Sequence, residues 1–508
     1  MFRNLLLCFF SAFLMVFSWP HSGFPFLIFG ALVPLFFVLK EVRNKREAFL
    51  CSFLVFALWN AFTTYWIYNA SLFGAIAAIL VNSILMASVV TLFVWIKSKF
   101  NDRRAWWALI SFWLGFEYLH LNWDLSWPWL TLGNVFSHYP QHIQWYEFTG
   151  VLGGSLWIVL ANIMLYHSIK NKSRYVWSLL VIALPFFVSA LMNTVDSKGK
   201  EVEVVVVQPN IDPYLDKFDG LTSIQQLEKF IELAETKLDS TTDYLIGPET
   251  AIVDGMWENT IENALEIKRL RQLIEKYPKL NIVIGAVTYK AYSEQDKIPH
   301  TARSYNGFDT YYDVFNSALQ INNSSLSIYH KSKLVQGVEF TPFPALLENL
   351  EFLSIDLGGI SGSLGTQDFR EVFPSSSAQI APIICYESIF GEYTTNYVRN
   401  GADVFTIITN DGWWKDTPGY KQHLNYASLR AIECRRAIAR SANTGVSAFI
   451  DSRGTIRNAT RWNEEVVIKD TLVTNQYQTL YVRFGDYIGR LSAFIAIMFL
   501  CFAFAKRN

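Results

Sequence analysis

The chain has 508 residues, too many for one ordinary domain; 51% are hydrophobic, 17% are charged, and the formal net charge is −1. No basic stripe indicates a nucleic-acid partner, and five cysteines are too few for a disulfide framework. Residues 1–195 and 485–505 are apolar runs joined by short polar loops, whereas residues 196–484 carry most of the charge. The composition therefore indicates membrane-embedded segments and one large polar domain.

Eight apolar runs are candidates for membrane helices, because about 20 apolar residues cross the ~30 Å hydrocarbon core of a bilayer. The first run is short, but Phe17-Ser18-Trp19-Pro20 is a poor signal-peptide cleavage site, so we interpret it as an uncleaved helix. The eight predicted spans are residues 3–18, 22–39, 47–68, 71–96, 105–121, 147–167, 175–195 and 486–505.

The positive charge of the loops predicts how these spans are oriented. Basic residues occupy every second loop, and Arg3 lies on the same side as they do. The basic segments are residues 40–46, 97–104, 170–174 and 506–507. We therefore expect a protein of the cytoplasmic membrane with both termini in the cytoplasm. The polar domain then lies outside this membrane.

The outer loop from His120 to Trp145 mixes Trp, Pro and Gly residues around Trp127 and Trp129. One interpretation is an aromatic belt at the membrane interface, where tryptophans are enriched. The other is a re-entrant element that lines a cleft for lipid access. The sequence leaves both open.

The polar region alternates strand and helix patterns, which indicates an α/β domain. A strand is predicted at Val202–Gln208, where the apolar run is typical of a strand buried on both faces. Further strands are predicted at 244–247, 281–287, 316–322, 326–330, 379–385, 404–409 and 446–451, and helices at 223–238, 261–277, 388–400 and 420–440. The domains are therefore expected at 1–195 (seven spans), 196–484 (catalytic) and 485–508 (eighth span and tail).

Three residues that can carry chemistry follow directly after predicted strands, where α/β proteins place their sites. They are Glu249, Lys331 and Cys385. Taken singly, the two charges are ordinary solvated surface groups and the cysteine an ordinary buried apolar residue. The strand-to-helix corner at Cys385 nevertheless predicts a thiolate, because backbone N–H groups and a helix dipole stabilise it. A carboxylate, an ammonium and a thiol together fit covalent acyl transfer.

The polar region resembles the nitrilase (carbon–nitrogen hydrolase) superfamily, whose triad is Glu, Lys and Cys in this order. With the predicted helices, the whole chain resembles the bacterial apolipoprotein N-acyltransferases. The resemblance covers almost the full length. It rests on Val207-Gln208-Pro-Asn210-Ile211, Pro248-Glu249-Thr250, Tyr329-His-Lys331 followed by Glu339, Cys385-Tyr386-Glu387, Asn410-Asp411-Gly-Trp413-Trp414, and His423 through Arg440 to Asn443-Thr444-Gly445.

The resemblance implies a nitrilase-like four-layer αββα sandwich beside the multi-pass α-helical membrane domain. It implies that an acyl chain from a phospholipid, typically phosphatidylethanolamine, becomes a thioester on Cys385. The chain then passes to the α-amine of the N-terminal diacylglyceryl-cysteine of an apolipoprotein. In this scheme Glu249 is the general base and Lys331 stabilises the oxyanion. No cofactor or metal is implied, the lipid bilayer is a partner, and a monomer is expected.

Supporting roles follow from the same resemblance. Glu339, eight residues after Lys331, is expected to orient Lys331 or the acceptor amine, and Tyr386 and Glu387 match family residues beside the nucleophile. Two stretches depart from the family. Its Leu-Val-Pro-Phe-Gly-Glu loop is Leu334-Val-Gln-Gly-Val-Glu339 here, without the proline. An active-site tryptophan of the family is either replaced by Phe218 or displaced.

The helix predicted at 420–440 carries Arg430, Glu433, Arg435, Arg436 and Arg440, which we interpret mainly as a solvated or salt-bridged face. An alternative is that Arg430 and Glu433 brace the catalytic loop. Trp413 and Trp414 have two interpretations, a buried aromatic pair or a membrane contact.

Two rival functions are compatible with parts of the sequence. A membrane-tethered nitrilase-type amidase or hydrolase would give the acyl group to water, but one helix would suffice to tether it. A non-catalytic lipid-binding or transport protein predicts a broken triad, whereas Glu249, Lys331 and Cys385 are all present. A phospholipid acyl donor accounts for the helices, the outer tryptophans and the thiol together.

Overall fold

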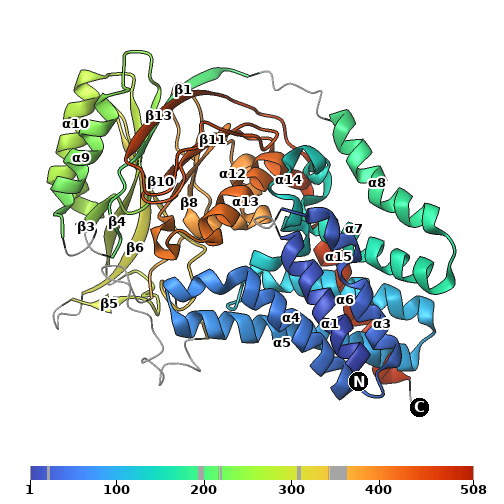
Figure 1. Ribbon diagram of the computed structural model, residues 1–508. Helices are drawn as coiled ribbons and strands as arrows, with labels where there is room; N and C mark the ends of the chain where they lie inside the picture. The colour runs from blue at the N-terminus through green and yellow to red at the C-terminus, as the bar shows by residue number, and fades with distance from the viewer. Residues whose placement is uncertain are drawn as a thin grey trace. The chain divides into compact units, whose positions relative to one another are not determined.

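The computed structural model describes residues 2–19, 23–192, 199–214, 217, 220–293, 295–305, 310–340, 342–343 and 363–506. The chain divides into two compact units (Figure 1). The helical unit comprises Met1–Val195, Lys421–Glu433 and Thr479–Asn508, and the α/β unit comprises Asp196–Tyr420 and Cys434–Gln478. The sequence predicts a catalytic domain at 196–484, and this division stays a prediction. The segment Lys421–Glu433, by contrast, packs with the helical unit, although the sequence places it inside the polar region.

The helical unit consists of helices joined by short 3₁₀ turns. Its helices are α1 (Phe2–Ser18), α2 (Ile28–Ala31), α3 (Val33–Glu41), α4 (Lys45–Thr64), α5 (Leu72–Lys99), α6 (Asp102–His120), α7 (Tyr146–Asn171), α8 (Tyr175–Met192), α14 (Leu480–Phe484) and α15 (Tyr487–Ala505), with most of α13 (Pro418–Cys434). Polar side chains tie some of them together. Asn162 of α7 accepts a hydrogen bond from Leu32 N at 2.8 Å and donates one to Ile28 O at 2.8 Å.

Five helices among the described residues are long and apolar enough to cross a membrane: Lys45–Asn69, Leu72–Lys99, Tyr146–Asn171, Tyr175–Met192 and Tyr487–Ala505. The other three predicted spans do not meet this standard. The first is an apolar helix of 17 residues, and the second is divided at Leu32 into α2 and α3. The helix at 105–121 is α6, whose first turn contains three charged residues. By length and composition, the described residues thus contain five candidate spans of a multi-pass membrane protein.

The loop from 120 to 145 folds into three 3₁₀ turns, η3 (Pro128–Leu130), η4 (Leu132–Phe136) and η5 (Pro140–His142). Trp129 is buried, and its Nε1 donates to Gln422 Oε1 at 2.6 Å, while Trp66 Nε1 donates to the same oxygen at 3.3 Å. The aromatic-belt interpretation is therefore wrong for Trp129, which serves as an internal contact between this loop and the segment Lys421–Glu433.

The α/β unit contains two sheets (Figure 1). The larger has the order β13-β1-β2-β4-β6-β5, with β3 on β4 and β7 on β6, and the smaller has the order β12-β11-β10-β9-β8. The strands are β1 (Glu201–Gln208), β2 (Tyr244–Ile246), β3 (Ile252–Trp257), β4 (Asn281–Tyr292), β5 (Arg303–Ser304), β6 (Tyr311–Ile321), β7 (Leu326–His330), β8 (Ile380–Ile384), β9 (Val404–Thr409), β10 (Ile438–Ala442), β11 (Ala448–Ile450), β12 (Ile456–Arg457) and β13 (Val466–Val473).

The sheets face each other, and helices cover their outer sides, which gives the predicted αββα order. Helices α9 (Ser223–Glu235) and α10 (Leu265–Lys276) cover the larger sheet, and α12 (Gly391–Arg399) packs against β8 of the smaller one. Ser441 Oγ of β10 donates to Val207 O of β1 at 2.9 Å, so a hydrogen bond also joins the two sheets.

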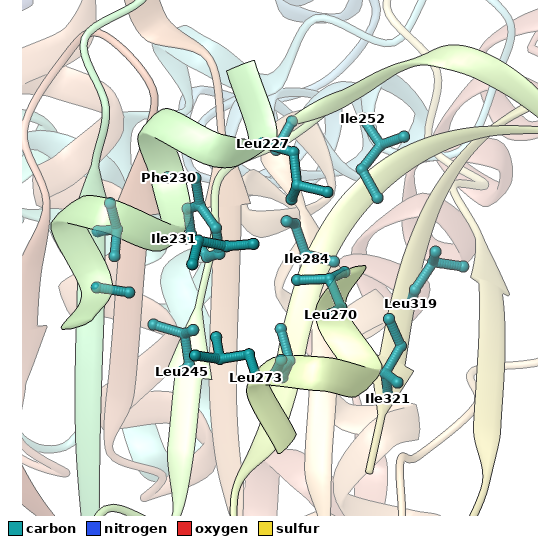
Figure 2. Close-up of a cluster of buried hydrophobic side chains, with 14 of the residues drawn as sticks. Leu227, Phe230, Ile231, Leu245, Ile252, Leu270, Leu273, Ile284, Leu319 and Ile321 are labelled. Carbon is teal, nitrogen blue, oxygen red and sulfur yellow. The ribbon is translucent and has the colours of Figure 1, made fainter. Parts of the chain in front are cut away.

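The apolar core under α9 and α10 follows from their sequence patterns. Thr222 and Gln225 form a capping box that begins α9, and Leu227, Phe230 and Ile231 then recur on one face. Figure 2 shows these side chains directed toward Leu245, Ile284 and Leu319 of the sheet, with Leu270 and Leu273 of α10 beside them. Each such buried side chain contributes about 1.5–3 kcal/mol.

Two predicted elements are wrong in type or extent. The helix at 420–440 ends at Cys434, and residues 438–442 form β10, because the chain turns sharply at Arg435, which has a φ of 49°. The helix predicted at 388–400 is present as α12 but begins only at Gly391, because the 3₁₀ turn η8 (Cys385–Ile389) precedes it. The strands β3, β5, β12 and β13 were not predicted.

Candidate active site

Three strands of the α/β unit end next to the predicted chemical residues. The strand β2 leads to Glu249, β7 to Lys331 and β8 to Cys385. The strand β2 is parallel to β4, whereas β6 is antiparallel to β4 and pairs with β7 in turn. This topology delivers the carboxylate and the ammonium from the larger sheet, and the thiol from the smaller.

Lys331 lies between two carboxylates in the interior of the α/β unit. Its Nζ is 2.9 Å from Glu249 Oε1 and 2.9 Å from Glu339 Oε1. All three side chains are nearly inaccessible to solvent, with Lys331 only 1% exposed. Burial alone would lower the pKa of Lys331, but the charges of Glu249 and Glu339 outweigh it and raise the pKa well above the usual value. Lys331 is therefore a fixed positive charge.

Hydrogen bonds hold Glu249 in a single orientation. Asn316 Nδ2 donates to Glu249 Oε1 at 2.8 Å and to Glu339 Oε1 at 2.9 Å, and Asn410 N donates to Glu249 Oε2 at 3.1 Å. Burial would raise the pKa of Glu249, yet the charge of Lys331 and these donors hold it below the usual value. Glu249 is thus ionised and ready to accept a proton.

Gly285 of β4 allows the loop that carries Glu249 to lie close to the sheet. A Cβ at this position would be 2.7 Å from Glu249 Cα and 2.4 Å from Thr250 N. Thr250 itself has a φ of 49°, in the left-handed region. The base is therefore placed by a close backbone approach that only glycine permits.

Cys385 has a φ of 47°, which is uncommon for a residue with a side chain and marks a strained corner. Burial and the charge of Glu249 raise the pKa of the Cys385 thiol, and the opposing effect of Lys331 is smaller. The expectation of a resting thiolate is therefore wrong: the dipole argument required a helix, and a five-residue 3₁₀ turn begins there instead. The thiol is protonated at rest and needs a base.

Lys217 is a second buried cation near these groups, and sequence reasoning missed it. Its Nζ donates to the backbone carbonyl oxygen of Glu249 at 3.0 Å, and the residue is 1% exposed. Burial lowers the pKa of Lys217 to about 8, although the charges of Glu249 and Cys385 act in the opposite direction. A lysine in a polar stretch gives no signal of burial, so only the fold reveals it.

Glu387 links the backbones beside two of the three residues. Its Oε2 accepts from Ile384 N at 2.9 Å, directly before Cys385, and its Oε1 accepts from Ser332 N at 2.7 Å, directly after Lys331. The hydroxyls of Tyr329 and Tyr393 also donate to Oε1, at 2.8 and 2.5 Å. Burial raises the pKa of Glu387. Its position is that of a brace between the two catalytic strands.

The loop from Leu334 to Glu339, which lacks the family's proline, is closed by hydrogen bonds. Val335 N donates to Glu339 Oε2 at 2.9 Å, and Glu339 N donates to Val335 O at 2.9 Å. Gly337 has a φ of 76°, which glycine adopts at no steric cost. Gln336 forms a side-chain hydrogen bond with Tyr386, so the residue after Cys385 is tied to the same loop.

The other predicted site residues are less closely connected to Glu249, Lys331 and Cys385. Trp413 and Trp414 are half-buried and lie in the 3₁₀ turn η9 (Asp411–Trp414), which begins directly after Asn410. The Trp413 ring is 5.3 Å from that of Tyr214, whose hydroxyl donates to Trp413 O at 2.8 Å. Phe218 lies outside the described residues.

The arginines that were predicted to form a solvated face are mostly buried. Arg440 Nη2 pairs with Asp411 Oδ2 at 2.6 Å, and both side chains are fully buried. Thr409 Oγ1 donates to the other oxygen of Asp411 at 2.9 Å, which fixes the start of η9. Arg430 and Glu433 form an ion pair of 2.8 Å within the helical unit, so the salt-bridged part of the interpretation is right and the solvated part is wrong.

The side chains of this site suit covalent acyl chemistry rather than metal binding. Within the ranges described above, no three His, Cys, Asp or Glu side chains are grouped as a metal ion requires. A buried thiol, an ionised carboxylate and a permanent ammonium can instead form an acyl-thioester and release it.

The chain matches two known families over consecutive parts. Residues 11–164 match the apolipoprotein N-acyltransferase N-terminal domain, and residues 203–480 match the carbon-nitrogen hydrolase family. It is 29% identical to the apolipoprotein N-acyltransferase of Chlorobaculum tepidum, over 96% of this chain and 94% of the relative. It is 26% identical to apolipoprotein N-acyltransferase 1 of Treponema denticola, over 99% of this chain and 98% of the relative.

Among solved structures, Nit3 of Saccharomyces cerevisiae, a member of branch 10 of the nitrilase superfamily, is similar to part of the chain. The similarity covers 56% of this chain and 93% of Nit3, with 16% identity and a TM-score of 0.38.

Proposed function

Since the chain belongs to the carbon-nitrogen hydrolase family, with an apolipoprotein N-acyltransferase N-terminal domain before it, we propose that it acylates apolipoproteins. Curated apolipoprotein N-acyltransferases match it over nearly their whole length. The observation that carries this function is the combination of a buried carboxylate–ammonium–thiol site and a multi-pass helical region in one chain. A phospholipid acyl donor accounts for both.

In the first half-reaction, we propose that Glu249 takes the proton of the Cys385 thiol. The sulfur then attacks the ester carbonyl carbon of a phospholipid, for which phosphatidylethanolamine is the expected donor. A C–S bond forms and the ester C–O bond breaks. The lysophospholipid oxygen leaves with the proton that Glu249 holds, so the carboxylate is regenerated. The raised pKa of Cys385 makes this base necessary.

In the second half-reaction, the α-amine of a diacylglyceryl-cysteine attacks the thioester carbon. Glu249 accepts a proton from the nitrogen and returns it to the departing sulfur, so an amide forms and the free thiol is restored. Lys331 supplies a fixed positive charge for the oxyanion of both tetrahedral intermediates. Glu339 shares Lys331 with Glu249 at equal distances of 2.9 Å, which supports an orienting role.

Glu387 and Tyr386 support the geometry rather than the proton transfers. Glu387 is a positioning residue, because it holds the backbones next to Lys331 and Cys385. Tyr386 holds the loop that carries Glu339 through Gln336. Trp413, Trp414 and Phe218 are proposed substrate-binding residues, since amphipathic and aromatic side chains suit a lipid substrate.

The membrane arrangement proposed from the basic loops has eight crossings, both termini in the cytoplasm and the α/β unit in the periplasm, with the protein acting as a monomer. Five of these crossings rest on helices long and apolar enough by themselves. The periplasmic side is where the acceptor, a lipoprotein already carrying diacylglycerol, would meet the thioester.

Mass spectrometry of lipoprotein N-termini tests this function in cells. Depletion of the protein should convert N-acylated termini to diacylglyceryl termini with a free amine. A plasmid copy should restore the N-acyl group, and a Cys385→Ala copy should not. Unchanged N-termini after complete depletion would contradict the proposal and favour a nitrilase-type hydrolase that uses water.

A further inference from the structure

A cavity of about 530 Å³ lies in the α/β unit, and none of Glu249, Lys331 and Cys385 lines it. It opens between the segment that follows β7, the segment before β8, and helix α12. Its lining includes Lys333, Gln367, Arg370, Tyr393, Asn396 and Asn400. The function proposed above does not use this cavity.

Two cations in the lining have no carboxylate partner among the residues that the structure describes. Lys333 is half-buried, and its ammonium lies 4.9 Å above the ring of Phe390 without a hydrogen bond in the described part of the chain. Arg370 donates to the hydroxyls of Tyr329 and Tyr393 and to two backbone carbonyls. Asp368 also lines the cavity, but it is exposed and pairs with neither cation in the described ranges.

Lys333 is partly desolvated beside a second cation. Burial lowers the pKa of Lys333 and the positive charge of Arg370 lowers it further, while the weaker effect of the Glu387 charge opposes them. Cations are normally brought together and partly desolvated only where an opposite charge compensates them. Asn396 adds a neutral donor: its Oδ1 accepts from Arg399 at 2.9 Å, and its side-chain N–H groups face no acceptor among the described residues.

We propose that this cavity binds a phosphate group through Lys333, Arg370 and Asn396. A phosphate has several acceptor oxygens, which suit the three donors of an ammonium and the N–H groups of an amide at once. Both Nη groups of Arg370 already donate within the protein, so this residue contributes mainly its positive charge. The same chemistry occurs in a free phosphate ion and in the glycerophosphate head group of a phospholipid. Binding of the phospholipid head group rests on the acyl transfer proposed above, whereas binding of a free phosphate ion does not.

The cavity is connected by hydrogen bonds to the backbone of the active site. Arg370 donates to the Tyr393 hydroxyl, and that hydroxyl donates to Glu387, which accepts from Ile384 N and Ser332 N. Substitution of Arg370 would therefore disturb the brace as well as the cavity. Lys333 makes no such contact, so Lys333→Gln is the cleaner probe of ligand binding.

Calorimetric titration of the full-length protein tests the proposal. The protein carries Cys385→Ala, so that no acyl transfer occurs, and is purified in detergent and phosphate-free buffer. Inorganic phosphate and glycerophosphoethanolamine are titrated separately. Lys333→Gln should weaken binding at least about 10-fold, because a charge-assisted contact to the anion is lost. Lys237→Gln, which removes an exposed lysine remote in sequence, should leave binding unchanged.

The two probes distinguish the sources of the phosphate. Tighter binding of glycerophosphoethanolamine that depends on Lys333 supports a lipid head group, and tighter binding of inorganic phosphate that depends on Lys333 supports a free anion. Equal affinities for the Lys333→Gln and unsubstituted proteins with both probes, or no binding at all, would overturn the proposal. Acylation of Cys385 in the protein without substitutions is measured separately, so failure of the cavity proposal and failure of the proposed function give different results.

Discussion

Replacement of Glu249 by Gln should slow the loading of Cys385 far more than it changes the fold. The carboxylate accepts hydrogen bonds from Lys331 Nζ, Asn316 Nδ2 and Asn410 N. A glutamine keeps an acceptor oxygen and nearly the same volume, and Lys331 retains its contact with Glu339 at 2.9 Å. The variant should therefore fold, with its ammonium still charged.

The expected loss follows from the protonated state of the thiol. Because burial and Glu249 raise the pKa of Cys385, almost no thiolate exists at neutral pH without a base. General base catalysis contributes about 10²–10⁴-fold, which corresponds to a barrier raised by about 2.7–5.5 kcal/mol. The loading rate of Glu249→Gln should also increase with pH, since thiolate must then form by direct ionisation from a raised pKa. The wild-type rate should be flat in the neutral range, because the pKa of Glu249 is held low.

Single-turnover mass spectrometry of the intact protein with phospholipid measures this rate. Glu262→Gln is the matched control, because its carboxylate is 56% exposed and pairs with Arg271 at the surface. A Glu249→Gln rate within about threefold of the control, or one that is independent of pH, would refute the assignment of Glu249 as the base.

Three further predictions rest on the surrounding structure. Gly285→Ala should lower the loading rate of Cys385 at least about 10-fold, because the added Cβ displaces the loop that carries Glu249. Gly30→Ala, where the nearest atom to the added Cβ is 3.8 Å away, should leave this rate unchanged. Asp411→Asn should reduce the free energy of unfolding by about 3–5 kcal/mol in chemical denaturation, because it removes the carboxylate charge that compensates buried Arg440; a loss below about 1 kcal/mol would contradict this. Burial lowers the pKa of Lys217 from 10.5 to about 8. Between pH 8 and 10.5 the unfolded chain therefore binds more protons than the folded chain. The stability of the wild type relative to Lys217→Met should therefore rise by about 3 kcal/mol from pH 8 to 10.5, and an unchanged difference would show that Lys217 is not buried.

Much of the α/β unit could be predicted from the sequence because its central strands are short apolar runs with clear ends. The strands β7 and β9 agree with the predicted bounds, and β1, β2 and β8 agree within one residue. The strand β10 could not be predicted, because its residues Ile438–Ala442 include an arginine and continue a helical pattern. Only the buried pairing of Arg440 with Asp411 makes a strand acceptable there.

The candidate site, too, could be predicted from the sequence only in part. Glu249, Lys331 and Cys385 could be placed together because each follows a strand, and their flanks resemble a known family. The protonation state of Cys385 could not be predicted, since it depends on burial and on the charge of Glu249 rather than on the local chain direction. The same applies to Lys217, which contacts Glu249 O from a distant part of the sequence.

The spans could be predicted only in part, for a related reason. Apolarity alone does not distinguish a helix that crosses a bilayer from helices that pack inside the unit. The segment 22–39 is apolar throughout but divides at Leu32, where Leu32 N donates to Asn162 Oδ1 of α7. Pro34 lies in the first turn of α3, where proline ends a preceding helix, and Asn162 satisfies the Leu32 N–H group at the break.

The most direct test of acyl transfer is the fate of the loaded enzyme. Incubated with phospholipid alone, the protein should gain the mass of one fatty acyl group on Cys385, removable by hydroxylamine as a thioester is. A diacylglyceryl peptide with a free α-amine should then discharge the adduct and become N-acylated, whereas the N-acetylated peptide should leave it intact. Discharge by water as fast as by the free amine, or the absence of any adduct on Cys385, would contradict the account.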